Sequence, residues 1–127
     1  MKTIKLISAL VFVGLLLTLS TTMSAQDPVK AAANVYKKVL LDNDQVRVLQ
    51  VEFAPGDVAP WHQHPNHVIY ALNDGKLEIT DKGKTASVLE IKAGDTMYLA
   101  AVTHMAKNVG TTTLKLVVTE LKPAAKK

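Results

Sequence analysis

Short apolar segments, each closed by a turn, follow one another along the chain from residue 35 to residue 121, and they constrain the fold more than any other feature. The clearest segment is 46–53, in which Leu49, Val51 and Phe53 alternate with more polar residues. An alternation of period two is typical of a strand that packs on at least one side. Turn residues such as Pro55 and Gly56 follow it, because proline fixes φ and glycine permits the left-handed region.

The same reasoning predicts a series of strands and no long helix. The expected strands are residues 35–41, 46–53, 58–64, 68–72, 76–80, 85–91, 96–100, 104–108 and 114–121. Between two of them, Asp74 and Gly75 form a pair that favours a tight hairpin turn. Many short strands at this spacing predict an all-β sandwich or barrel with no second domain. Residues 26–45 are expected to be a lead-in, briefly helical, followed by the first strand.

The first 25 residues read as a targeting segment. Lys2 and Lys5 precede an apolar run over residues 6–19, and a polar stretch of small residues leads to Ala25. This order is typical of a secretory signal peptide, and the run is short for a membrane span of about 20 residues. We therefore predict cleavage after Ala25 and an exported protein, periplasmic or secreted, with no membrane span in the mature chain. The alternative is an uncleaved N-terminal anchor.

The net charge argues against nucleic acid as a partner, and the cysteine content excludes disulfides. The formal charge is +4; Lys2 and Lys5 leave with the predicted signal peptide and no acidic residue does, so +2 remains, which is too little to indicate nucleic acid. The tail 122–127 is basic and reads as a solvated end. The chain has no cysteine, so the exported domain must be stable without disulfides.

The positions of the histidines indicate a metal-binding site. All four fall in two places: His62, His64 and His67 lie within six residues, and His104 lies some 40 residues later. Side chains two residues apart on a strand share one face, so His62 and His64 would project together. Neutral imidazoles bind zinc, copper, iron and nickel, and three of them leave positions open for water or substrate. The alternative is that these are surface histidines without a ligand.

Residues 46–121 resemble a cupin. The first cupin motif has a glycine, five residues and His-x-His, matched here by Gly56, His62 and His64, and the block ends at Gly75. The second motif begins Gly-Asp and leads to a histidine and an asparagine. It is matched by Gly94-Asp95, His104 and Asn108.

This resemblance implies a single conical jelly-roll β-barrel with a divalent metal ion inside, held by His62, His64 and His104. The glutamate ligand of the family is missing, since its place falls on Val68 or Ile69. His67, one or two residues earlier, is the candidate replacement; otherwise it is a solvent-facing turn residue. The Pro-x-Gly turn of the second motif is also absent and reads Leu99-Ala100-Ala101-Val102.

Several functions remain open from the sequence. Iron, copper or manganese would fit a small-molecule dioxygenase, and zinc or nickel an isomerase or hydrolase that uses a Lewis acid. A non-catalytic module that binds a small ligand is the second class, and a metal-free β-barrel used for assembly is the third. Self-association as a homodimer through a sheet edge is compatible with all three.

Overall fold

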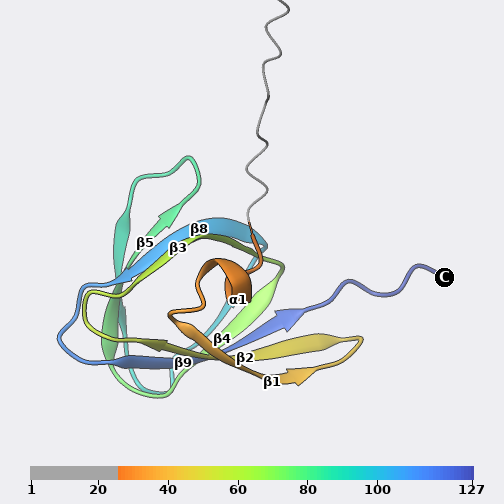
Figure 1. Ribbon diagram of the computed structural model, residues 1–127, viewed down its shortest axis with the longest axis horizontal. Coiled ribbons are helices and arrows are strands. Elements are labelled where there is room, and N and C mark those ends of the chain that lie inside the picture. The colour runs from red at the N-terminus through yellow and green to blue at the C-terminus, as the bar shows by residue number, and fades with distance from the viewer. Residues whose placement is uncertain (1–25) are drawn as a thin grey trace, which may run out of the picture.

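The computed structural model describes residues 26–127, which form one short helix and nine strands (Figure 1). The predicted signal peptide lies outside the described residues. The elements are α1 (Pro28–Ala31), β1 (Tyr36–Asp42), β2 (Val46–Phe53), β3 (Val58–His64), β4 (His67–Ala71), β5 (Gly75–Asp81), β6 (Ser87–Ile91), β7 (Thr96–Leu99), β8 (Val102–Asn108) and β9 (Leu114–Leu121). The predicted all-β class is confirmed. Within the described part, no helix is both long and apolar enough to span a membrane.

The strands form two antiparallel sheets. One has the order β1-β2-β9-β4-β7 and the other the order β3-β8-β5-β6. Figure 1 shows the two sheets curving toward each other around a common interior. They are not closed into one continuous ladder, because each sheet keeps its own edge strands. The expectation of a single closed conical barrel is therefore corrected to two facing sheets.

The core lies between the sheets and follows the alternation of the strands. Leu49, Val51 and Phe53 on β2 are at most 3% exposed, as their period-two spacing predicts. Leu114 and Leu116 are likewise buried on β9, which lies between β2 and β4. The core therefore consists largely of Leu, Val and Ala. Burial of each Leu or Val side chain contributes about 1.5–3 kcal/mol relative to leaving it exposed.

Gly75 has a different role from the one its sequence predicts. The expected hairpin does not form, because β4 belongs to one sheet and β5 to the other. A Cβ on Gly75 would lie 2.8 Å from Leu114 Cδ1, so glycine is needed for close approach to the core. Gly56, in contrast, has a φ of +84° and makes the turn that was predicted for it.

The lead-in to the barrel is an ordered part of the molecule. Asp27 caps α1 by accepting a hydrogen bond from Val29 N, and Pro28 begins the helix. Just before the helix, Gln26 forms an isolated bridge with His62 on β3. α1 contacts β3 of one sheet and β1 of the other, at the opening between them (Figure 1). The segment 26–36 therefore connects the two sheets beside the histidines.

Candidate metal centre

Three of the four histidines meet on one pair of strands. His62 and His64 both point inward from β3 because they are two residues apart, whereas Trp61, just before them, points out and is 41% exposed. His104 on β8 lies directly opposite His62 in the antiparallel register. Each of the three offers a nitrogen within 4.8 Å of the other two, and all three side chains are buried. The predicted approach of the downstream histidine to the early pair is confirmed.

Hydrogen bonds fix the orientation of two of these rings. His62 Nδ1 lies 2.6 Å from the carbonyl oxygen of Pro60, and His64 Nδ1 lies 2.7 Å from Glu120 Oε1. Both partners are acceptors, so each Nδ1 carries the proton and donates it. The lone pair is then on Nε2 in both rings. Outer hydrogen bonds of this kind hold histidine ligands in the tautomer that metals require.

His67 lies on β4 in the opposite sheet, next to His64, with ring centroids 4.6 Å apart. Its Nδ1 donates to the Pro65 carbonyl over 2.8 Å, which leaves the lone pair on Nε2. That Nε2 is buried and has no hydrogen-bond partner among the described residues. His67 is thus an interior residue, but the group of mutually close nitrogens consists of His62, His64 and His104. Its ligation stays a prediction.

Tyr36 is the residue at this centre that sequence reasoning did not find. It begins β1, is 7% exposed, and places its hydroxyl oxygen 2.8 Å from His64 Nε2 and 3.2 Å from His62 Nε2. A tyrosine at the start of a strand carries no local signal for such a position, because its partners lie 26 and 28 residues away.

A chain of charged groups holds the Nδ1 side of the His64 ring. Glu120 on β9 is 3% exposed and accepts from His64 through one oxygen and from Arg47 through the other. Arg47 lies 2.6 Å from Glu120 Oε2 and 2.7 Å from Asp27 Oδ2. Burial alone would raise the pKa of Glu120, but the bonds from His64 and Arg47 outweigh it and lower that pKa. The carboxylate is therefore ionised when it holds His64.

Burial keeps the imidazoles of His62, His67 and His104 neutral. It lowers the pKa of His62 to about 4, against the hydrogen bond to Pro60. It lowers the pKa of His104 to about 3, and the neighbouring His62 and His64 lower it further. The pKa of His67 is lowered for the same main reason. Burial also raises the pKa of Tyr36 above its usual range, with the charge of Glu120 adding to it. Near neutral pH the rings of His62, His67 and His104 are therefore uncharged and the Tyr36 phenol is protonated.

Hydrogen-bond accounting indicates that a cation fits this centre. The inward lone pairs on Nε2 belong to His62, His64 and His67, and the Tyr36 hydroxyl has a single proton to donate. At least two buried acceptors therefore stay without a donor, which is unfavourable. Three buried histidines are positioned to hold a metal ion, and a cation would satisfy these lone pairs together.

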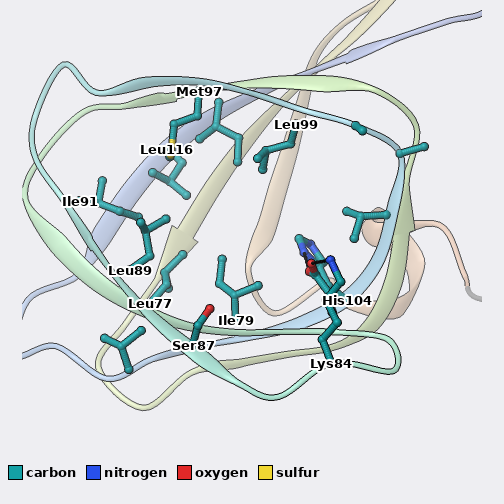
Figure 2. A pocket seen from close by; sticks show the side chains of 16 residues that line it. Leu77, Ile79, Lys84, Ser87, Leu89, Ile91, Met97, Leu99, His104 and Leu116 are labelled. Carbon is teal, nitrogen blue, oxygen red and sulfur yellow. Dashed lines mark ion pairs between the residues drawn. The ribbon is translucent and has the colours of Figure 1, made fainter.

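An apolar pocket of about 380 Å³ adjoins His104. Figure 2 shows His104 near Lys84 at one end of the pocket, with Ile91, Met97 and Leu116 at the other. Asp81 also lines it, with Oδ1 3.8 Å from His104 Nδ1 and Oδ2 3.6 Å from Lys84 Nζ. The pocket is in the size range of small-ligand sites, which are mostly apolar with a few polar groups.

Asn108 of the second cupin motif and two tyrosines on neighbouring strands do not reach the histidines. Asn108 is buried, but its amide donates to the carbonyls of Phe53 and Thr112, so it secures a loop and does not reach the histidines. Tyr70 on β4 and Tyr98 on β7 are 46% and 62% exposed. Both are on the outer face of their sheet.

Fold and site together define a small β-sandwich with a buried histidine centre beside an apolar pocket. The model of the cupin domain family matches residues 49–120, more than half of the chain. The protein belongs to the cupin family. No curated protein is significantly similar to it.

Solved structures agree with this assignment. A cupin domain from Bordetella pertussis Tohama I is 25% identical, with a TM-score of 0.64, covering 68% of this chain and 91% of that one. A protein of Klebsiella pneumoniae with a double-stranded β-helix domain is 23% identical, with a TM-score of 0.57 and coverages of 70% and 77%. An RmlC-like cupin family protein of Methanocaldococcus jannaschii is 17% identical, with a TM-score of 0.56 and coverages of 67% and 77%. The last two support the fold alone.

Proposed function

We propose that this cupin binds one divalent metal ion through His62, His64 and His104 and presents it to a small molecule in the adjoining pocket. The observation that carries the proposal is the convergence of three buried nitrogens within 4.8 Å, two of them with Nε2 turned inward by their Nδ1 hydrogen bonds. Iron, zinc, nickel, copper and manganese all accept imidazole, so the donors leave the metal open.

The small molecule we propose is mainly apolar with one polar end. Leu77, Ile79 and Ile91 are among the side chains that would contact its apolar part. Its polar end would lie toward His104, where Asp81 and Lys84 form the charged group of the pocket. Bound metal would supply a Lewis acid there, or a redox centre if it is iron or copper. The chain's own part is to orient the ligand and exclude water from the inner end.

Elemental analysis of protein purified without an affinity tag tests metal binding. After incubation with each of the five metals and removal of excess, we expect about one equivalent of at least one of them. Less than about a tenth of an equivalent of every metal would contradict the proposal and favour a metal-free barrel.

Oxygen uptake then separates an enzyme from a binding module. The iron-loaded protein is tested against diketones, thiols and phenols, which combine an apolar body with a metal-binding end. Uptake that depends on the substrate supports a dioxygenase. Binding of such a molecule to the metal-loaded protein without oxygen uptake or turnover supports a module that captures small ligands.

We also propose that the protein is exported and begins at Gln26 after cleavage. The charged start, apolar run and small-residue exit of residues 1–25 support this. Intact mass of the protein recovered from the periplasm or medium would test it. A full-length mass in the membrane fraction would instead indicate an anchor.

A further inference from the structure

Tyr36 occupies the place at which a fourth donor to the metal would be needed. Its hydroxyl oxygen contacts Nε2 of His62 and Nε2 of His64, at 3.2 and 2.8 Å. Two donors about 2.1 Å from a tetrahedral metal are about 3.4 Å apart. The observed distances fall short of that spacing by only about 0.2 and 0.6 Å. A small displacement therefore converts hydrogen bonding into shared coordination.

The position is fixed by the packing of the N-terminal segment. Tyr36 follows α1, and its backbone N–H donates to Ala32 O at 3.0 Å. Its ring packs against His62 and His64 at centroid distances of 5.4 and 5.6 Å. The ring is buried, so the hydroxyl has few alternative partners.

Charge balance favours an oxygen anion at this position. Glu120 and Asp27 are both paired with Arg47, so the trio carries one net negative charge. Asp81 and Lys84 cancel. A divalent ion among neutral imidazoles would leave the buried cluster with one excess positive charge, which is unfavourable away from water. A phenolate oxygen on the metal makes the cluster neutral.

We propose that Tyr36 is the fourth protein ligand of the metal and takes the place of the glutamate that this chain lacks. The assignment rests on the proposed function, since it requires a metal at the three histidines. When the metal binds, the oxygen–metal bond forms, the hydroxyl proton passes to solvent, and the hydrogen bond to His64 Nε2 is replaced by a bond from that nitrogen to the metal. No electron is transferred.

The competing candidate is His67. Its Nε2 is buried and without a partner, but it lies outside the group of mutually close nitrogens, and the ring approaches the centre on the side of His64. Tyr36 instead contacts two members of that group at once. The two assignments predict opposite results for the variants Y36F and H67A.

The first readout is metal affinity, measured with zinc by competition against a chromophoric chelator. We expect Y36F to weaken affinity by at least about tenfold, and H67A to have a smaller effect. Y98F is the matched control, because Tyr98 is exposed and should leave affinity unchanged. Equal or tighter binding by Y36F would overturn the proposal, since the hydroxyl would then only compete with the ion. Loss confined to H67A would assign the fourth position to His67.

The second readout is the visible spectrum of the ferric or cupric protein. A phenolate on either metal gives a charge-transfer band that histidines alone do not give. The chain has three tyrosines, so the band should persist in Y70F and Y98F and vanish in Y36F. The wild-type spectrum alone decides even if Y36F folds poorly, because metal-loaded wild type without the band overturns the proposal. Wild type that binds no metal would instead refute the proposed function.

Discussion

The two regions that build the metal centre differ in how they reach it. Strands β3 and β8 bring His62 and His104 together through an antiparallel ladder, in which the two residues face each other directly after an irregularity between Ala59 and His62. The segment 26–36 reaches the same point with strand pairing only at its two ends, where Gln26 bridges to His62 and Tyr36 begins β1. Between them Asp27 pairs with Arg47, and the Tyr36 ring inserts beside the histidines. The strands β3 and β8 contribute the imidazole nitrogens, and the segment 26–36 contributes the Tyr36 hydroxyl oxygen and the charge of Asp27.

The two regions thus differ in what determines their structure: local sequence patterns in one case and contacts with distant residues in the other. The strands that carry the histidines are predicted from alternation and turn residues, which are signals that can be recognised within a short segment of sequence. The N-terminal segment contributes through partners tens of residues away, and its own pattern indicates little beyond a helix start at Asp27 and Pro28. Variants in the two regions should therefore have effects of different size.

Removing a histidine of the ladder should have the largest effect. His104→Ala deletes one of the three nitrogens, and we expect the retained metal to fall below about a tenth of an equivalent, measured by elemental analysis after loading and dialysis. Gln63→Ala is the control, because Gln63 is exposed between His62 and His64. Full occupancy in His104→Ala would place the metal elsewhere.

Acid should destabilise the metal-free protein through the same histidines. Folding lowers the pKa of His62 to about 4 and of His104 to about 3, from 6.5. Below pH 6.5 the unfolded chain binds protons that the folded protein does not, so the free energy of unfolding falls as the pH drops from 6.5 toward 4. Each of the two rings should contribute on the order of 3 kcal/mol to this loss, measured by urea unfolding at several pH values.

A variant tests the origin of that slope. His104→Asn has no titrating group at this position and should remove about half of the pH dependence, because His62 still contributes, while Y36F should leave it largely intact. A wild-type stability that stays constant between pH 7 and 4 would contradict the buried, neutral state of the two rings.

The support behind His64 should have an intermediate effect. Glu120→Gln keeps the shape but removes the charge that holds His64 Nδ1–H and Arg47. We expect metal affinity to fall by about 10- to 100-fold, as is typical for such outer hydrogen-bond partners, measured by chelator competition. Glu90→Gln, at an exposed glutamate, is the control. Unchanged affinity would show that the ring is held by packing alone.

The smallest effect is expected at the outer end of the charge chain. Asp27→Asn breaks the pair with Arg47 but leaves Arg47 on Glu120. The Asp27 side chain is 37% exposed, so we expect a loss of about 1 kcal/mol or less in thermal or urea unfolding. Metal affinity should change by less than about threefold. A loss as large as that of Glu120→Gln would make the N-terminal segment as important as the ladder.

The sequence predicts the elements of this fold well because their signals are local. The strands Val46–Phe53, Val58–His64 and Leu114–Leu121 begin and end where alternation and turn residues place them. The three histidines were also found, since His62 and His64 share a face by spacing and the cupin resemblance supplies His104.

What the sequence did not predict depends on contacts between distant segments. Gly75 reads as a hairpin residue until its contact with Leu114 is known. Tyr70 and Tyr98 lie in strands but are exposed, whereas Tyr36, at the start of the first strand, is the tyrosine that reaches the interior. The choice depends on which sheet face turns inward and on how the lead-in packs. Closure of the two sheets is likewise a global property that no single segment encodes.

The bridge between Gln26 and His62 has a consequence for association. β3 is an edge strand of its sheet, and an open edge invites a foreign strand to add to it. Here the protein's own backbone takes that place, with Gln63 N donating to Gln26 O. Strand addition is thereby obstructed at His62 and Gln63, whereas the other margins of the two sheets, β1, β6 and β7, are edge strands as well.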